Sequence, residues 1–260
     1  MSASPKRLAG KTAIVTGSSR GIGRGIAARF AQEGANVIIN YVGALGAAEE
    51  ALAEIVAAGG RGVLLKADVS SVPEVIGLVE AAVGEFGTVD ILVNNAGVEA
   101  HAAFWDVTEA DYDRIMSVNV KGAFFAAQAL TRHLRNTHRP GRIINISSVH
   151  EDMAFPNFAA YCASKGALRM LARTLAVELG PLGITINNIA PGAIETPINT
   201  ALLNDPVKLR SLLKQIPLGR LGQPADVAGL AAFLASEDAA YVTGSTFVVD
   251  GGLSVFYEEQ

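Results

Sequence analysis

Short runs of apolar, often β-branched residues alternate along the chain with longer stretches of amphipathic, helical spacing. The runs, which we predict to be strands, are Thr12–Thr16, Asn36–Tyr41, Gly62–Lys66, Val89–Asn94, Arg142–Ser147, Ile184–Ile189 and Thr246–Val249. The stretches between them predict helices near residues 21–34, 45–59, 72–86, 107–137, 158–179 and 223–236. Strands that are apolar on both faces and separated by helices form parallel sheets covered on both sides. The pattern therefore predicts one doubly wound α/β domain with a seven-stranded parallel sheet.

The composition and charge of the chain exclude several classes of function. The chain has 260 residues, half of them apolar, and its net charge of -4 is interspersed, so no nucleic-acid partner is expected. We see no apolar run that could span a membrane and no signal peptide. The single cysteine, Cys162, cannot form an internal disulfide, which fits a cytoplasmic location. We expect no metal, because no ligand spacing joins His101, His133, His138 and His150 to cysteines or carboxylates.

Ligands of parallel sheets bind at the carboxyl ends of the strands, so chemistry is expected just after each run. The first such turn, Thr16–Gly23, places Gly17, Gly21 and Gly23 between a strand and a helix. A turn of this kind lets the backbone approach a pyrophosphate, which the free N–H groups of the helix then bind. The spacing is G-x-x-x-G-x-G and not the more common G-x-G-x-x-G. We predict a dinucleotide at this turn.

The end of the second strand bears on the choice of dinucleotide. A carboxylate there would bind the 2′-hydroxyl of NAD, but the residue is the neutral Asn40. Arg20 in the glycine-rich turn could reach a 2′-phosphate, or it could be a solvated loop residue. We predict NADP(H), with NAD(H) possible. Asp68 follows the third strand and suits an adenine contact, or a turn, because Ser70 and Ser71 come next.

Tyr161 and Lys165 lie four residues apart in a segment of helical composition, so both should share one helix face. An ammonium beside a phenol lowers the phenol pKa from about 10 and allows proton transfer near neutral pH. A surface tyrosine and a solvated lysine would have the same spacing. Ser148, after the fifth strand, could converge on them. Asn119 and Gly122 are poor helix formers, so they indicate either a polar core residue or a helix distorted to serve a site.

Together these motifs resemble the short-chain dehydrogenase/reductase family over about residues 8 to 254. The motifs that carry the resemblance are Thr16–Gly23, Asp68, Asn94–Gly97, Asn119, Ser148, Tyr161-x-x-x-Lys165, Pro191-Gly192 and Asp250-Gly251-Gly252. The resemblance implies a single Rossmann-type domain over residues 1–260. It also implies hydride transfer between a nicotinamide and a secondary alcohol or carbonyl.

The resemblance also implies residue roles. Tyr161 would be the general acid/base, Ser148 would hold the substrate oxygen, Lys165 would bind the nicotinamide ribose, and Asn119 would hold a water. Residues 193–218 would be a mobile substrate lid, and the helices 107–137 and 158–179 would pair between subunits of a homotetramer. The expected cofactor-binding residues are Gly17, Ser19, Arg20, Gly21, Ile22, Gly23, Asn40, Tyr41, Asp68, Val69, Asn95, Ala96, Gly97, Tyr161, Lys165, Pro191, Gly192, Ile194 and Thr196.

Within that family the chain is most similar to bacterial glucose 1-dehydrogenases. The stretches that carry this are Asn94–Glu99, Ser147–Glu151 and Pro191–Asn199. Glu99 and His150 would then orient a hydroxyl-rich substrate beside Ser148 and Tyr161. Val42 departs from this group, which often has a basic residue there.

Three alternatives stay open. A carbonyl reductase would use an apolar pocket formed by Met153, Phe155 and the lid. A 3-oxoacyl-[acyl-carrier-protein] reductase would need a basic patch, for which the candidates are Arg132, Arg135, Arg139, Arg142, Arg169 and Arg173, although solvated helix faces are the favoured explanation of these arginines. A nucleotide-sensing protein without catalysis is the third, and the intact set of Asn119, Ser148, Tyr161 and Lys165 argues against it.

Overall fold

Seven parallel strands form one sheet in residues 6–256, which the computed structural model describes apart from the side chains of Ile198 and Ala201. Their order across the sheet is β3-β2-β1-β4-β5-β6-β7. The strands are β1 (Thr12–Val15), β2 (Asn36–Tyr41), β3 (Arg61–Lys66), β4 (Ile91–Asn94), β5 (Gly141–Ile146), β6 (Ile184–Pro191) and β7 (Thr246–Val249). The order reverses between β1 and β4, and sheets of this kind bind ligands at such a point, beyond the carboxyl ends of the strands. The predicted fold class is confirmed.

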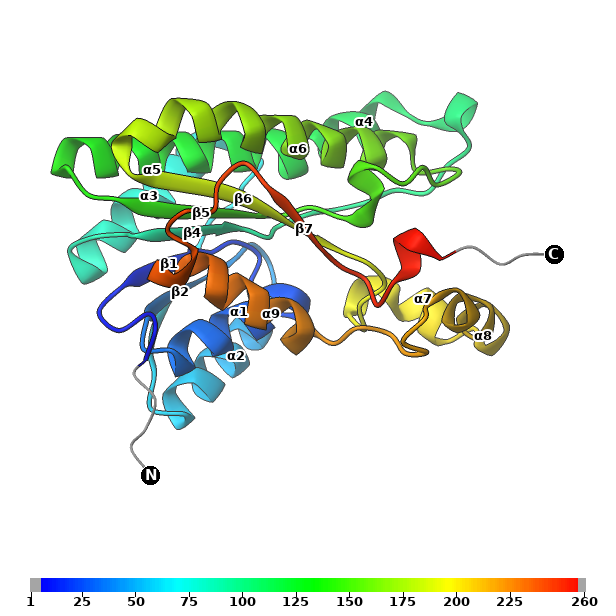
Figure 1. Ribbon diagram of the computed structural model, residues 1–260, viewed down its shortest axis with the longest axis horizontal. Helices are drawn as coiled ribbons and strands as arrows, with labels where there is room; N and C mark the ends of the chain where they lie inside the picture. Colours follow the sequence, from blue (N-terminus) through cyan, green and yellow to red (C-terminus); the bar gives the residue numbers. More distant parts are fainter. Residues whose placement is uncertain (1–5, 257–260) are drawn as a thin grey trace.

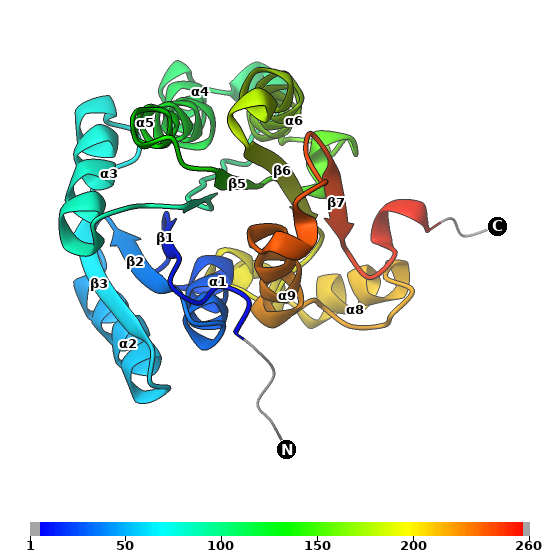
Figure 2. The ribbon, with the colours of Figure 1, turned by 60° about the vertical axis from the view of Figure 1, so that its left-hand side comes forward.

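Helices cover both faces of the sheet (Figures 1 and 2). One layer holds α1 (Gly21–Gln32), α2 (Leu45–Ala57) and α9 (Pro224–Ala235), and the other holds α3 (Val72–Phe86), α4 (Glu109–Met116), α5 (Ala123–Thr137) and α6 (Ala159–Leu179). Side chains alternate along each strand, so Val15 packs in the core cluster with α1 and α9, whereas Ile14 packs with α3 and α5. Burial on both faces explains why the strands read as continuous apolar runs.

The predicted helix 107–137 is wrong as one regular element. Residues Ser117–Gly122 form a π-helical segment between α4 and α5. A Cβ on Gly122 would lie 2.7 Å from the backbone oxygen of Val69, so only glycine lets the helix approach the turn after β3 this closely. The alternative of a local distortion is therefore confirmed, and π-helical turns of this kind are frequent at functional sites.

Strand ends differ from the prediction by one or two residues. Strand β6 runs two residues further, to Pro191, because the N–H of the next residue, Gly192, still donates to Val249 of β7 at 2.9 Å. Strand β5 ends at Ile146 and not at Ser147, which leaves Ser147 and Ser148 in the turn beyond the sheet.

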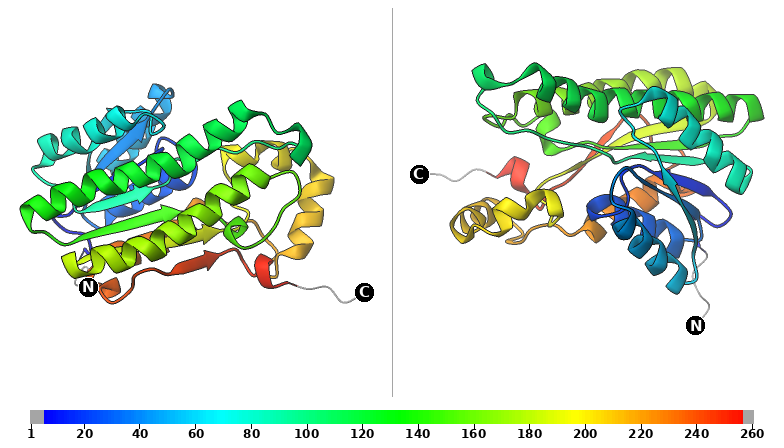
Figure 3. Two further views of the ribbon diagram at one scale, coloured as in Figure 1. Left: turned by 90° about the horizontal axis from the view of Figure 1, so that it is seen from above. Right: turned by 180° about the vertical axis from the view of Figure 1, so that it is seen from behind.

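A helical excursion follows β6 and stands away from the sheet at its carboxyl edge (Figure 3). It contains the short helix η5 (Pro197–Asn199), then α7 (Thr200–Leu203) and α8 (Pro206–Gln215). Other single-turn helices are η1 (Phe104–Asp106), η3 (Val149–Glu151), η4 (Gly180–Leu182), η6 (Glu237–Ala239) and η7 (Leu253–Val255). Among the described residues, no helix has both the length and the apolar character needed to cross a bilayer.

Candidate active site

The turn between β1 and α1 forms an anion cradle. Gly17 and Gly21 have φ angles of +60° and +58°, which glycine adopts without strain. A Cβ on Gly23 would lie 2.5 Å from the side-chain nitrogen of Asn95, so the backbone is closely packed here. Helix α1 begins without a side-chain cap and without an acidic residue in its first turn. Its first N–H groups therefore suit a pyrophosphate, and the predicted dinucleotide fits this turn.

Hydrogen bonds fasten this turn to the end of β4. The hydroxyl of Thr16 accepts from the backbone N–H groups of Asn95 and Ala96 at 2.9 and 3.0 Å. The Asn95 amide donates to the backbone oxygens of Thr16 and Gly17 at 2.8 and 3.1 Å. The residues predicted to line the cofactor from β1 and β4 are thus brought together.

Asn40 does not behave as predicted. Its side-chain oxygen accepts from Gly17 N–H at 3.0 Å, and its amide group donates to the carbonyl oxygens of Ala67 and Leu65 at 3.0 and 3.3 Å. The residue is only 2% exposed. Since both N–H groups and the oxygen are engaged within the fold, the expected ribose contact of this side chain is corrected to a structural one. The exposed side chain at the end of β2 is Val42.

Arg20 and Asp68 are the other two residues that were expected to contact the adenosine half of the cofactor, and the structure supports these contacts only in part. Arg20 is exposed at the N-cap position of α1, beside the anion cradle. One carboxylate oxygen of Asp68 accepts from the N–H of Ser70 at 2.8 Å, so the turn alternative is confirmed for that oxygen. An adenine contact remains a prediction.

Tyr161, Lys165 and Ser148 converge as predicted. The ammonium nitrogen of Lys165 lies 5.3 Å from the centre of the Tyr161 ring, and a hydrogen bond joins Ser148 to the Tyr161 phenol. Lys165 is 4% exposed and donates to the backbone oxygen of Ile146 at 2.9 Å. A Cβ on Gly97 would lie 3.7 Å from the ammonium, so the end of β4 closes over the same place.

Asn119 ties three elements together from the π-helical segment. Its side-chain oxygen accepts from the N–H of Val98 at 2.8 Å, and its amide donates to the oxygen of Val98 and the hydroxyl of Ser164 at 2.9 and 3.0 Å. It is 2% exposed, so the polar-core alternative also holds. The distortion of the helix brings this amide between the loop after β4 and helix α6.

The predicted lowering of the Tyr161 pKa is wrong. Burial raises the pKa of the Tyr161 phenol, and the hydrogen bond from Ser148 opposes that change only in part. Burial likewise lowers the pKa of Lys165 to about 8, against the influence of Glu151 and Glu99. Desolvation disfavours the charged form of each group and is the largest influence on both pKa values. At neutral pH Tyr161 is therefore protonated and is able to donate its proton.

Glu99 and His150 lie beside this group. Burial raises the pKa of the Glu99 carboxyl, whereas the neighbouring charges of His150, Lys165 and His101 act to lower it. His150 Nδ1 is 3.0 Å from the carbonyl oxygen of Met153, which can only accept, so Nδ1 carries a proton. In the neutral ring, Nε2 is then an acceptor.

Aromatic rings pack beside His150 and Tyr161. We call the place where Tyr161, Ser148, Glu99 and His150 converge the cleft. The centre of the His150 ring lies 5.1 Å from that of Phe155 and 6.4 Å from that of Phe158. Phe158 is in turn 6.0 Å from Tyr161 and 5.1 Å from His101. Sequence reasoning considered His101 only as a metal ligand and missed it here, although its place after β4 was a signal.

Asparagines at the end of the fourth strand were expected to tie neighbouring strand ends together, but the full row to which Asn94 belongs was missed. Asn94, Asn145 and Asn188 are in register on β4, β5 and β6. The Asn94 amide donates to Asn145 at 2.9 Å, and the Asn145 amide donates to Asn188 at 3.0 Å. Aligning the asparagines near the ends of the predicted strands would have indicated this row.

The basic patch considered for an acyl carrier protein does not form as a group. Arg139 pairs with Asp90 at 2.6 Å, and Arg142, which is 7% exposed, pairs with Glu237 at 3.1 Å. Arg169 pairs with Glu151 and Asp152. In the part of the chain that the structure describes, no group of histidine, cysteine and acidic side chains is arranged to hold a metal ion.

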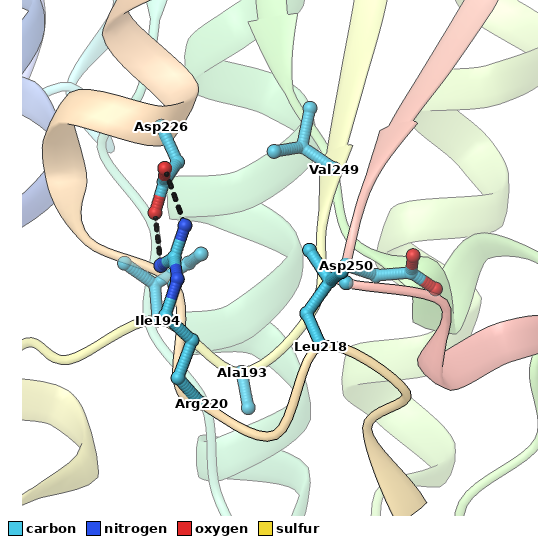
Figure 4. A pocket seen from close by; sticks show the side chains of 9 residues that line it. Ala193, Ile194, Leu218, Arg220, Asp226, Val249 and Asp250 are labelled. Atoms are coloured by element: carbon cyan, nitrogen blue, oxygen red, sulfur yellow. Dashed lines mark hydrogen bonds and ion pairs between the residues drawn. The ribbon is translucent and has the colours of Figure 1, made fainter.

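The two ends of the 193–218 segment meet at its base. Ile194 and Gly222 form a parallel bridge, and the N–H of Glu195 donates to the oxygen of Gly222 at 2.8 Å. Beside this base lies a cavity of about 100 Å³, where the guanidinium of Arg220 faces the carboxylate of Asp226 at 2.7 and 3.0 Å (Figure 4). The cavity is separate from the cleft at Tyr161, since none of the catalytic candidates lines it.

The start of the same segment covers the anion cradle. A Cβ on Gly21 would lie 3.5 Å from the methyl group of Thr196. Gly192 is held against Asp250, where a Cβ would come within 2.7 Å of that side chain. The segment after Pro191 is thus positioned between the glycine-rich turn and the end of β7, as its expected contact with a cofactor requires.

Known proteins resemble this chain along nearly its whole length. A family model described as enoyl-(acyl carrier protein) reductase matches residues 17–254. The 3beta-hydroxysteroid dehydrogenase 1 of Eggerthella lenta is 45% identical over 96% of this chain and 95% of its own. Glucose 1-dehydrogenase 2 of Bacillus subtilis is 42% identical over 96% and 97%. The crystal structure of a gluconate 5-dehydrogenase from Burkholderia cenocepacia, in complex with NADP and tartrate, has a TM-score of 0.91, with 37% identity over 97% of this chain and 98% of that one.

Proposed function

Because this chain belongs to the short-chain dehydrogenase/reductase family and is one of its NAD(P)-dependent enzymes, we propose that it moves a hydride between NADP(H) and a ring hydroxyl of a sugar-like substrate. The observation that carries the substrate proposal is the pair Glu99 and His150, whose polar groups flank Ser148 and Tyr161. A hydroxyl-rich substrate requires such partners, because each polar group left unpaired costs about 1–3 kcal/mol.

The cofactor is NADP(H), and NAD(H) is accepted less well. The bound nicotinamide accepts or supplies the hydride. Support comes from the exposed Arg20 at the anion cradle and from the absence of an acidic side chain among Asn40, Tyr41 and Val42. The gluconate 5-dehydrogenase that the chain resembles was crystallised with NADP.

The residues have distinct roles in the proposed reaction. Tyr161 exchanges a proton with the substrate oxygen, Ser148 holds that oxygen, and Lys165 binds the nicotinamide ribose. The side chain of Asn119 is engaged with Val98 and Ser164, so the water proposed beside Lys165 would be held by the Asn119 backbone. The raised pKa of Tyr161 suits proton donation during carbonyl reduction at neutral pH. Oxidation needs the phenolate, which burial disfavours and the hydrogen bond with Ser148 favours.

The aromatic side chains complement the polar pair. The C–H face of a sugar ring can lie on Phe155 or Phe158 while its hydroxyls reach Glu99 and His150. The test is a panel of glucose, gluconate, a hydroxysteroid and small ketones, measured in both directions with both cofactors. Turnover of polyhydroxylated substrates above the others supports the proposal, and absence of glucose and gluconate oxidation would refute it.

A second candidate substrate is an apolar ring alcohol or ketone. The aromatic cluster of His101, His150, Phe155 and Phe158 favours it, and a hydroxysteroid dehydrogenase is among the relatives. The same panel decides between the two. An acyl-carrier-protein substrate has less support, since three of the six arginines proposed to bind it, Arg139, Arg142 and Arg169, are engaged in ion pairs. A sensor without catalysis would give no turnover at all.

We extend the proposal to the whole protein. Residues 193–218 act as a substrate lid anchored at Ile194 and Gly222. The chain forms one cytoplasmic domain, and of the range 1–260 predicted for it, residues 1–5 and 257–260 lie outside the described residues. The subunits assemble as a homotetramer through α5 and α6, where Phe124, Met170 and Val177 are 41%, 61% and 78% exposed. Light scattering on the purified protein tests the assembly, and a monomer would contradict it.

A further inference from the structure

Glu151 is a buried carboxylate that the proposed reaction does not use. It ends the short helix η3, directly after Ser148, and its side chain is 1% exposed. Buried carboxylates are rare unless they are paired, because removing the charge from water is costly. Its surroundings therefore indicate what the charge does.

Helix α6 approaches Glu151 at a glycine. A Cβ on Gly166 would lie 3.9 Å from the backbone oxygen of Glu151, so η3 packs on the helix between Lys165 and Arg169. These two cations are four residues apart and share one face of α6. One carboxylate oxygen of Glu151 lies 3.8 Å from Arg169 Nε and has no hydrogen-bond partner in the described structure.

Arg169 neutralises Glu151 only in part. Its guanidinium also pairs with Asp152, whose side chain is 65% exposed. Lys165, on the same face of α6, is 4% exposed, and Glu151 acts on its charge. The ammonium of Lys165 donates to a neutral acceptor, the backbone oxygen of Ile146. That bond supplies no negative charge, so the negative charge that balances the Lys165 ammonium must act on it through space.

The asparagine row fixes the orientation of Glu151. Asn94 donates to Asn145, Asn145 donates to Asn188, and Asn188 donates to the second carboxylate oxygen of Glu151 at 3.4 Å. Every amide thus points its donor toward Glu151, and an ionised carboxylate is an acceptor only. The aligned chain of amide donors therefore ends on the Glu151 carboxylate and holds it in place.

We propose that Glu151 is a positioning residue, a buried counter-charge held by the asparagine row that keeps the ammonium of Lys165 protonated. This inference rests on the proposed role of Lys165 at the nicotinamide ribose. Burial lowers the pKa of Lys165 to about 8, and Glu151 has the largest influence opposing that change. Without Glu151 the lysine would lose its charge near neutral pH.

Other charged groups around Lys165 do not replace Glu151. Glu99, in the loop after β4, has the smaller influence on the lysine. The strand beneath α6, β6, offers neutral amides at this level, Asn188 among them. On the neighbouring helical segments, Asp111 and Arg114 pair with each other at the surface, and Lys121 is exposed.

The test compares Glu151→Gln with Asp152→Asn in protein without cofactor. The glutamine keeps the shape and the acceptor for Asn188 but removes the charge. Lys165 is titrated by NMR of protein with labelled lysine side chains, and its signal is assigned with Lys165→Arg. We expect the Lys165 midpoint to fall by about one pH unit or more in Glu151→Gln, and by a few tenths at most in Asp152→Asn.

A second variant, Glu151→Asp, keeps the charge and should hold the midpoint closer to wild type than glutamine does. Thermal unfolding of each variant checks the fold. Unchanged Lys165 titration in Glu151→Gln, or equal shifts in the Gln and Asp variants, would overturn the inference even if turnover fell. Failure of the wild type to oxidise sugars would refute the proposed substrate and leave this titration unaffected.

Discussion

The side-chain oxygen of Asn40 accepts a hydrogen bond from the backbone N–H of Gly17 at 3.0 Å. This contact joins the end of β2 to the glycine-rich turn, while the Asn40 amide donates to Leu65 and Ala67 beside β3. The position that was expected to discriminate between NAD and NADP therefore holds the anion cradle in shape.

Asn40→Asp should weaken the whole cradle and not switch the cofactor. A carboxylate can still accept from Gly17, but its second oxygen would face the carbonyl oxygens of Leu65 and Ala67. We expect a loss of about 2–3 kcal/mol in the free energy of unfolding and weaker binding of both NADPH and NADH. Asn36→Asp, at the half-buried start of β2, is the control and should cost less. A selective gain for NADH would contradict this account.

Arg20→Ala isolates the contact to the 2′-phosphate. Charge-assisted hydrogen bonds contribute roughly 1.5–3 kcal/mol, so the Kd for NADPH should rise by about tenfold or more. The Kd for NADH should stay nearly constant, because it lacks that phosphate. Fluorescence titration of both cofactors measures this, with Arg132→Ala on the exposed face of α5 as the control. Equal weakening of both would make Arg20 a general phosphate contact.

The strand pattern was sufficient to predict the sheet, because strands buried on both faces are apolar throughout, as Ile14 and Val15 illustrate. Convergence of Ser148 with Tyr161 and Lys165 also followed, since the end of a strand and the start of the next helix can meet across the loop that joins them. The side-chain partners of Asn40 did not follow, because Leu65 and Ala67 are backbone acceptors from a strand whose register is set in three dimensions.

The four-residue spacing of Tyr161 and Lys165 also failed to predict how their pKa values change. The i, i+4 pair predicts attraction between Tyr161 and Lys165, but the extent of burial decides the sign of each pKa change. Burial at this place depends on Gly97 and the loop after β4, which are distant in sequence. The role of Glu151 was hidden for the same reason, since its partners lie on β6 and α6.

Tyr161→Phe tests the proton transfer. The ring and its packing against Phe158 remain, so the fold and the Kd for NADPH should be nearly unchanged. Turnover should fall by the roughly 10²–10⁴-fold that is typical of losing a general acid or base. Tyr112→Phe, on the exposed surface of α4, should retain full turnover. Near wild-type rates in Tyr161→Phe would remove this residue from the mechanism.

Glu33 should contribute to stability in a pH-dependent way. Its pKa is lowered to about 2, chiefly by the hydrogen bond from Arg7, and its side chain is 15% exposed. Because the folded pKa is below the unfolded one, the contribution is complete above about pH 4.5 and is lost as the pH falls toward 2. Glu33→Gln should cost about 1–3 kcal/mol at pH 7 and little near pH 2.

Denaturant unfolding at both pH values measures this effect. Glu85→Gln, an exposed carboxylate on α3, is the matched control and should change stability little at either pH. A Glu33→Gln penalty that stays the same at pH 2 and pH 7 would show that packing, and not charge, is what the substitution removes.

Glu99→Ala and His150→Ala decide what the cleft recognises. Both groups flank Ser148 and Tyr161, and His150 Nε2 is an acceptor while Nδ1 is held by Met153. If they bind substrate hydroxyls, each substitution should raise KM for glucose more than for a small apolar ketone, by about tenfold for a lost contact of 1–2 kcal/mol. Glu109→Ala, exposed at the start of α4, should leave both KM values unchanged. Equal losses on both substrates would mean that Glu99 and His150 shape the cleft without binding substrate hydroxyls. The aromatic side chains would then favour an apolar ring alcohol.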